Sequence, residues 1–330
     1  MEIVRGIYQL KVPIPDNPLG CLNAYVIDGG DGLALVDTGF NVPEALESLL
    51  SQLREHGFVP SDIRKLIITH WHPDHYGLAR EVKKRSGARL LVHRAEVEFL
   101  RDLLHRYPEF RRQTMEWLLE NGMPLEEIEQ LRPANEGFFG LDDETQVDQI
   151  LEGGETISVG RVELEVISTP GHSPGHICLY ERERRILLSG DHVLPIITPN
   201  ISMRTKSDQH QLSHFLDSLQ RLRHLEVDLV LPAHEHIFYS LGDRLEQIKQ
   251  HHEERCRAIA DAGGNGWSTG YEIASKIPWM EGQMPWATMP VFHRRWALTE
   301  TLAHLHFLSA RGAVRQSERD GLARWKTVRN

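Results

Sequence analysis

Cysteine is scarce in this sequence of 330 residues, and a long apolar run is absent. The three cysteines, Cys21, Cys178 and Cys256, are an odd number and form no C-x-x-C pair, which indicates reduced thiols rather than a disulfide framework. No run of about 18 apolar residues occurs, so no membrane-spanning helix is predicted. Because the first residues also lack the apolar stretch of a secretory signal, we expect a cytoplasmic protein.

Basic residues are outnumbered by acidic ones. The chain has 37 Lys and Arg against 47 Asp and Glu, a formal net charge of −10. Because binding to nucleic-acid phosphates requires an excess of cations, this balance disfavours a nucleic-acid partner. A small-molecule substrate is expected instead. With 40% hydrophobic and 25% charged residues, the chain has the composition of a globular protein, and 330 residues are enough for one large core plus a small appended domain.

The spacing of apolar residues predicts strands interleaved with helices, which is typical of an α/β protein. A hairpin is expected where residues 24–27 and 33–36 flank a Gly/Asp cluster. Helices are predicted over 42–56 and 74–85. Strands are predicted over 63–69, 88–93, 162–166, 177–180, 185–188 and 227–231.

Histidine is abundant, at 19 residues, and several histidines stand beside aspartates in four short motifs. Each motif follows an apolar, strand-like run, and loops at the ends of packed strands meet at one edge of a sheet. We therefore expect the motifs to converge. Their candidate ligands are His70, His72, Asp74 and His75 in the first motif, His172 in the second, Asp191 in the third and His234 in the fourth.

Imidazole and carboxylate ligands suit Zn²⁺, with Fe and Mn as alternatives. Seven candidates are too many for one tetrahedral ion but fit a pair of ions. Asp191 is the natural bridge, because a carboxylate can bind a different ion through each oxygen. Two adjacent cations lower the pKa of a shared water, so that a bridging hydroxide would be the nucleophile.

The pattern His-x-His-x-Asp-His, followed by Gly-His, Gly-Asp and a last His, resembles the metallo-β-lactamase superfamily over roughly residues 1–240. This resemblance implies an αβ/βα sandwich. It also implies that Asp37, in the segment Val36–Gly39, supports the ligands from behind. It assigns His70, His72 and His172 to one metal and Asp74, His75 and His234 to the other, with Asp191 between them.

Other histidines have plainer interpretations. His176 and His192 are expected to form hydrogen bonds or cap a helix, and His236 competes with His234 as a ligand. Surface or packed positions are expected for His210, His214, His251, His252, His304 and His306.

The predicted catalytic domain covers residues 1–242 and contains a helical insertion over 94–150, which is either a lid or extra scaffold. Residues 243–330 are predicted to form a small C-terminal domain with helices at 244–262 and 290–311 and a capping box at Thr269–Glu272. It resembles the winged-helix appendage of some glyoxalase II-like members. A homodimerisation role for it is an alternative.

The bridging Asp191 is absent from true β-lactamases of this fold, so the resemblance disfavours β-lactams as substrates. We expect hydrolysis of a thioester or lactone, with Asp74 as the catalytic residue that orients the hydroxide. The alternatives are a phosphodiesterase or endoribonuclease and, less favoured, an iron-dependent persulfide dioxygenase.

Overall fold

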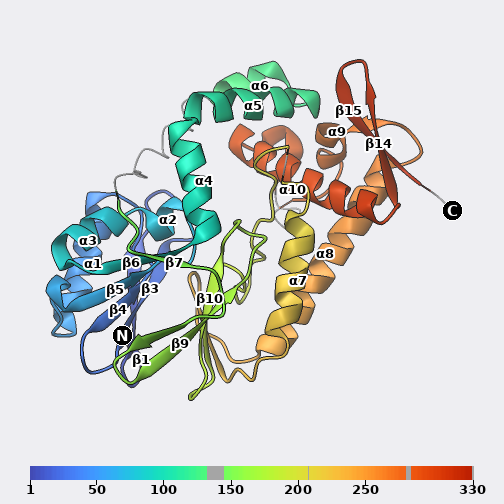
Figure 1. Ribbon diagram of the computed structural model, residues 1–330. Coiled ribbons are helices and arrows are strands. Elements are labelled where there is room, and N and C mark those ends of the chain that lie inside the picture. Colours follow the sequence, from blue (N-terminus) through green and yellow to red (C-terminus); the bar gives the residue numbers. More distant parts are fainter. Residues whose placement is uncertain (132–144, 207, 280–283, 329–330) are drawn as a thin grey trace. The chain divides into compact units, whose positions relative to one another are not determined.

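The computed structural model describes residues 1–131, 145–206, 208–279 and 284–328 (Figure 1). The chain forms two compact units. The first consists of residues 1–105, 138–199 and 218–245, and the second of 106–137, 200–217 and 246–330. The domain boundary near residue 242 stays a prediction, and each unit is described by itself below.

The first unit contains a sheet of seven strands in the order β1-β2-β3-β4-β5-β6-β7. Neighbours are antiparallel from β1 to β4 and parallel from β4 to β7, because helical connections begin after β4. The predicted hairpin is β3–β4. The strands are β1 (Glu2–Val4), β2 (Ile7–Pro13), β3 (Cys21–Asp28), β4 (Leu33–Val36), β5 (Ile63–Ile67), β6 (Arg89–His93) and β7 (Gln149–Leu151).

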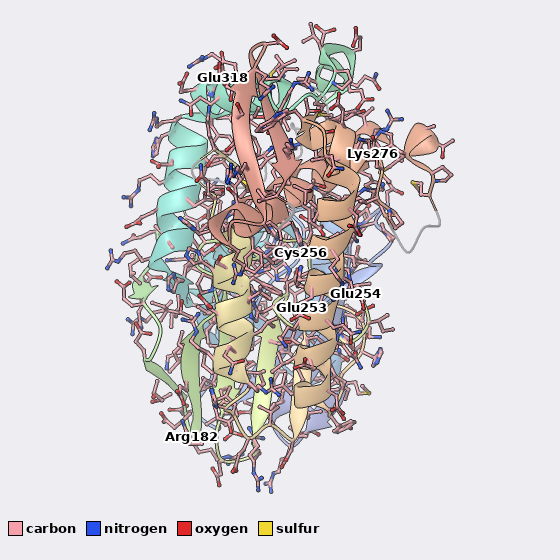
Figure 2. The ribbon with its side chains drawn as sticks, turned by 90° about the vertical axis from the view of Figure 1, so that its right-hand side faces the viewer. Arg182, Glu253, Glu254, Cys256, Lys276 and Glu318 are labelled. Carbon is pink, nitrogen blue, oxygen red and sulfur yellow. The ribbon has the colours of Figure 1, made fainter. Side chains whose placement is uncertain are left out.

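A second sheet has the order β12-β11-β10-β9-β8. Its strands β8 to β11 are antiparallel, whereas β11 and β12 run parallel. Figure 2 shows Arg182 in the charged turn, Arg182–Arg185, between β10 and β11. The strands are β8 (Thr156–Val159), β9 (Val162–Ser168), β10 (Ile177–Glu181), β11 (Ile186–Gly190) and β12 (Leu229–Pro232).

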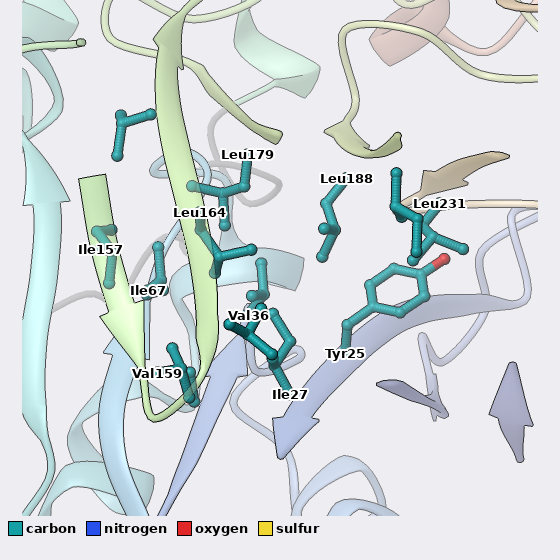
Figure 3. Close-up of a cluster of buried hydrophobic side chains, with 14 of the residues drawn as sticks. Tyr25, Ile27, Val36, Ile67, Ile157, Val159, Leu164, Leu179, Leu188 and Leu231 are labelled. Atoms are coloured by element: carbon teal, nitrogen blue, oxygen red, sulfur yellow. The ribbon is translucent and has the colours of Figure 1, made fainter. Parts of the chain in front are cut away.

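The hydrophobic core of the first unit lies between the two sheets (Figure 3). Tyr25, Val36 and Ile67 project from the first sheet, and Leu164 and Leu188 from the second; all are at most 2% exposed. Both sheets therefore depend on each other for burial of their inner faces.

The two sheets also meet at their hairpin tips. A Cβ atom at Gly29 would lie 1.5 Å from the carbonyl oxygen of Val159, so only glycine admits this approach.

Helices α1 (Pro43–Glu55) and α3 (Ala79–Ser86) cover the outer face of the seven-stranded sheet (Figure 1). The apolar face of α1 carries Ala45, Leu49 and Leu53 at helical spacing, and all three are buried. Residues 218–222 of α7 (Gln211–Leu222) remain with the first unit. The two sheets with their helices form the α/β sandwich expected from the sequence.

The predicted helix 74–85 is wrong as one element, since it is divided into α2 (Pro73–Tyr76) and α3. The Leu78 amide donates to the carbonyl of Gly39, 3.0 Å away, instead of continuing the helical ladder. A Cβ atom at Gly77 would lie 2.3 Å from the carbonyl oxygen of Pro73 and 2.8 Å from the amide nitrogen of Asn41. This tight contact with the loop after β4 is a tertiary effect that periodicity does not report.

The predicted insertion over 94–150 begins with three helices and ends in β7. The helix α4 (Arg94–His105) belongs to the first unit, whereas α5 (Tyr107–Glu120) and α6 (Leu125–Gln130) belong to the second. Most of the Gly/Phe/Asp-rich stretch at 135–148 lies outside the described residues. A lid function of the insertion stays a prediction.

The C-terminal part of the second unit contains α8 (Leu241–Gly263), which begins in the first unit, then β13 (Ser268–Thr269), α9 (Gly270–Ala274), α10 (Val291–Ala310), β14 (Val314–Arg319) and β15 (Leu322–Thr327). Figure 2 shows Glu253, Glu254 and Cys256 on α8 and Glu318 near the tip of the β14–β15 hairpin. The predicted capping box is confirmed, because Thr269 Oγ1 accepts from the Glu272 amide and the Glu272 carboxylate accepts from the Thr269 amide.

β14 and β15 form an antiparallel hairpin at the end of the described chain. The three strands pair in the order β13-β15-β14. Assignment of this unit to the winged-helix class stays a prediction. No helix in the described part of the chain is long and apolar enough to cross a membrane.

We predict that Leu164→Ala destabilises the protein by about 2–5 kcal/mol, because Leu164 is fully buried between the sheets and truncation leaves a cavity. Urea denaturation measures the free energy of unfolding. Glu163, the exposed neighbour of Leu164 on β9, provides the control. Glu163→Ala should change the free energy of unfolding by about 0.5 kcal/mol or less. Equal effects of the two variants would contradict this description of the core.

Glu300 on α10 is a buried carboxylate in the second unit. Its Oε2 accepts from Asn200 Nδ2 at 2.6 Å, and Arg255 Nε lies 3.8 Å from its Oε1. Burial raises the pKa of Glu300 to about 7, against the opposing effects of Arg255 and Asn200. The folded chain therefore holds a proton here that the unfolded chain releases near its ordinary pKa.

We predict that this group destabilises the fold as the pH rises from about 4.5 to 7, because the folded pKa lies above the unfolded one. Glu300→Gln should remove that slope and make the protein more stable than wild type at pH 8. Thermal unfolding between pH 5 and 8 measures the effect. Parallel pH profiles of the two proteins would show that Glu300 does not titrate as described.

Candidate metal centre

The four histidine motifs occupy the loops that follow four strands, as the sequence predicts. His70 and His72 follow β5, and His172 lies between β9 and β10. Asp191 follows β11, and His234 follows β12. Proline at position 73 begins α2 directly after His72, so that Asp74 and His75 lie in its first turn.

The first group of side chains consists of His70, His72, His172 and Asp191, whose ligand atoms lie within 4.8 Å of one another. His72 Nδ1 lies 2.8 Å from His70 Nε2 and 3.0 Å from His172 Nε2. Asp191 Oδ2 lies 3.9 Å from His70 Nε2 and 3.5 Å from His172 Nε2. Three imidazole nitrogens and one carboxylate oxygen thus converge, which is a donor set suited to one zinc-like ion.

The second group consists of Asp74, His75 and His234. Asp74 Oδ2 lies 3.3 Å from His234 Nε2 and 3.7 Å from His75 Nε2. The other oxygen of Asp191, Oδ1, lies 3.4 Å from His75 Nε2 and 3.3 Å from His234 Nε2. The two carboxylate oxygens of Asp191 therefore face different groups.

Charge distinguishes the two groups. Burial and the neighbouring imidazoles lower the pKa of His70 and His72 well below the usual range, so both rings are neutral at pH 7. Burial also lowers the pKa of His234, but Asp191 and Asp74 outweigh it and raise the value to about 10. The second group without metal therefore holds protons that an incoming cation would displace.

Buried polar atoms support a metal-binding role. Among the described residues, His75 Nε2, His234 Nε2 and Asp191 Oδ1 are fully buried and make no hydrogen bond of acceptable geometry. Such atoms are costly to desolvate unless they gain a partner. All three atoms converge, and a shared cation would give each of them a partner, so the residues fit a metal.

Hydrogen bonds behind the rings determine which nitrogen faces the centre. His75 Nδ1 donates to Asp37 Oδ2 at 2.8 Å, which leaves Nε2 for the centre. His234 Nδ1 donates to the carbonyl of Cys21 at 3.0 Å, with the same consequence. Asp37 also accepts from the amide and the hydroxyl of Thr69, both at 2.8 Å. It contacts His75 on the side away from the centre, and its support of a bound metal stays a prediction.

The remaining histidines take plainer positions. His176 is buried, its Nδ1 lies 2.8 Å from Thr169 Oγ1, and its Nε2 accepts from the Asp191 amide at 3.1 Å. It therefore holds a ligand loop by hydrogen bonds, as expected. His236, which competes with His234 in the sequence, is exposed.

Sequence reasoning missed Glu96. This residue of α4 lies fully buried against two of the ligand loops, in a segment where periodicity revealed only a helix. One acidic position within an amphipathic helix gives no local signal, so only the long-range contacts reveal it.

The sequence profile of the metallo-beta-lactamase superfamily matches residues 22–234, which include all four ligand motifs. The chain belongs to the metallo-beta-lactamase superfamily. Members of this superfamily are metal-dependent hydrolases, and this superfamily protein is therefore an enzyme of that class.

Three relatives illustrate the similarity. The crystal structure of a metallo-beta-lactamase family protein from Thermus thermophilus matches 99% of this chain and 100% of its own, with 30% identity and a TM-score of 0.83. Human acyl-coenzyme A thioesterase MBLAC2 is 29% identical over 228 residues, 66% of this chain and 74% of that protein. The beta-lactamase-like protein 2 homolog of Caenorhabditis elegans is 26% identical over 244 residues, 72% of this chain but only 63% of its own length.

We predict that Asp37→Asn weakens metal binding by about 10- to 100-fold, because an amide NH₂ facing His75 Nδ1 disfavours the tautomer that points Nε2 at the centre. Asparagine tolerates the left-handed backbone found here, at φ 59°, so backbone strain is not introduced. Competition with a chromogenic chelator measures the affinity. The exposed Asp217→Asn is the control, and an unchanged affinity in Asp37→Asn would contradict the role of Asp37.

Proposed function

We propose that the protein is a dinuclear metal-dependent hydrolase that cleaves a thioester, with lactones as the related substrate class. The observation that carries the proposal is Asp191, whose two oxygens face two separate groups of ligand atoms. In this proposal His70, His72 and His172 hold one ion, and Asp191 is shared. Asp74, His75 and His234 hold the other.

Two bound cations would supply Lewis acidity to the substrate carbonyl and lower the pKa of a water. Zinc is the ion we favour, because the donor set is imidazole and carboxylate and contains no thiolate. Iron and manganese accept the same donors, and metal analysis of the purified protein distinguishes the three.

Asp74 is the residue we propose to orient the attacking water. Its side chain is 18% exposed, more than the 11% of Asp191 and the 1% of His234. It can therefore be reached by water more readily than Asp191 or His234. Burial alone would raise the pKa of Asp74, but His75 and His234 bring it to about 2. The carboxylate is therefore ionised and can accept a hydrogen bond from a water.

Cys178 is not a competing nucleophile beside the ligand loops. Cys178 lies on β10 close to Thr169, but burial raises the pKa of its thiol to about 12. A thiol with so little thiolate is a poor nucleophile at neutral pH. This argues against a covalent acyl-enzyme on Cys178.

The substrate class rests on similarity as well as on the site. The name of the human relative describes an acyl-coenzyme A thioesterase, and carbonyl hydrolysis suits a site that combines a water-activating centre with a carboxylate. We therefore place a thioester ahead of a phosphodiester. The net charge of −10 also argues against a polyanionic substrate such as RNA.

We predict that purified protein reconstituted with Zn²⁺ hydrolyses a thioester or lactone from a panel that also contains bis-p-nitrophenyl phosphate. His234→Ala should lower kcat/KM by about 1,000-fold or more, because it removes a buried ligand to the centre. His236→Ala is the matched control, since His236 is exposed and two positions away.

Removal of metal by a chelator should abolish turnover in wild type, and added Zn²⁺ should restore it. Turnover of the phosphodiester alone would replace the thioesterase proposal with a phosphodiesterase. Full activity of His234→Ala would contradict the ligand assignment.

A further inference from the structure

We propose that Glu96 is a positioning residue of the metal centre, which ties together the two loops that carry His70 and His72 on one side and His172 on the other. The inference rests on the proposed metal centre but does not depend on the identity of the substrate. Glu96 comes from α4, the first helix of the segment that the sequence describes only as an insertion.

The contacts of Glu96 span both loops. Its Oε2 accepts from the backbone amide of Trp71, the residue between His70 and His72, at 2.7 Å. Its Oε1 accepts from Ser173 Oγ, directly after His172, at 2.7 Å and also from the amide of Gly175. One side chain therefore holds neighbours of three ligands of the first group, and it is 0% exposed.

These contacts require a carboxylate. All three partners donate, and an ionised carboxylate offers acceptor sites on both oxygens. Hydrogen bonds to an ionised group are about twice as strong as those between neutral groups, and burial away from water strengthens them further. A glutamine at this position would turn an NH₂ group toward either the Trp71 amide or the Ser173–Gly175 side, which replaces attraction by repulsion.

The packing leaves little freedom for another arrangement. A Cβ atom at Gly175 would lie 2.5 Å from His93 Nδ1 and 2.9 Å from the Glu96 amide nitrogen, so the loop after His172 lies directly against the start of α4. On the other loop, the ring centroid of Trp71 lies 4.9 Å from that of Phe99, which is one turn along α4 from Glu96. The helix thus contacts both loops by packing as well as by hydrogen bonds.

Holding the two ligand loops in place in this way affects the free energy of metal binding. His72 Nδ1 lies 2.8 Å from His70 Nε2 and 3.0 Å from His172 Nε2, so the close approach of these three rings depends on how both loops are placed. A rigid hydrogen-bonded support keeps them close, so that the free energy of ordering the loops is not subtracted from metal binding.

We predict that Glu96→Gln lowers the affinity for Zn²⁺ by about 10- to 100-fold, the effect typical of residues that support metal ligands. Competition with a chromogenic chelator measures the affinity without any substrate. Glu98→Gln is the matched control, because Glu98 lies two positions along the same helix and is exposed; its affinity should remain within about twofold of wild type.

A spectroscopic measurement separates positioning from general stability. In the Co²⁺-substituted protein, Glu96→Gln should change the visible absorption bands, which report ligand geometry, whereas Glu98→Gln should leave them as in wild type. Ser173→Ala, which deletes a single hydroxyl, should weaken metal binding in the same direction. The double variant should lose less affinity than the sum of the two, because both substitutions break one shared link.

Unchanged zinc affinity and cobalt spectrum in a folded Glu96→Gln protein would overturn the proposal. If Glu96→Gln does not fold, Ser173→Ala decides, and full metal affinity in that variant would reduce Glu96 to a structural role. A wild-type protein that binds no metal would instead contradict the metal centre itself, so the two failures are distinguishable.

Discussion

The mutual approach of Asp191 and the ligand histidines is the constraint on which the first unit depends. Imidazole nitrogens and carboxylate oxygens lie within 4.8 Å of one another in a buried place, where polar atoms without partners are unfavourable. The surrounding sheets, loops and carboxylates must supply the free energy that keeps these atoms close.

The sandwich supplies this free energy because the ligand loops are anchored at the ends of its packed strands. Each ligand loop follows a strand whose inner side chains pack between the sheets. The core therefore holds the backbone from which each ligand loop starts. Asn23 and Tyr25 of β3 extend this support by donating to the carbonyl of Pro232, at 3.0 and 2.8 Å, just before His234. Packing energy from the apolar core is thereby used to position polar groups.

Two further carboxylates, Asp37 and Glu96, act behind the ligands. Asp37 contacts His75 directly and determines its tautomer, whereas Glu96 contacts no ligand ring in the hydrogen bonds described above but fixes the backbone around His70, His72 and His172. One therefore controls the chemistry of a ligand atom, and the other controls its location. Their effects on metal binding are expected to be independent, because they serve different groups.

The sequence by itself determined the candidate ligands, their order along the chain and their place after strands, because His/Asp motifs and apolar runs leave local patterns. It also located Asp37 through a short motif and the capping box at Thr269. Other features were decided by tertiary structure alone: the two-sided orientation of Asp191, the exposure of His236, the break at Gly77 and the role of Glu96. Each depends on contacts between residues far apart, such as Glu96 with Ser173, 77 positions away, and His234 with Cys21, 213 positions away. Local periodicity carries no information on such contacts, since they form only when the sheets bring the loops together.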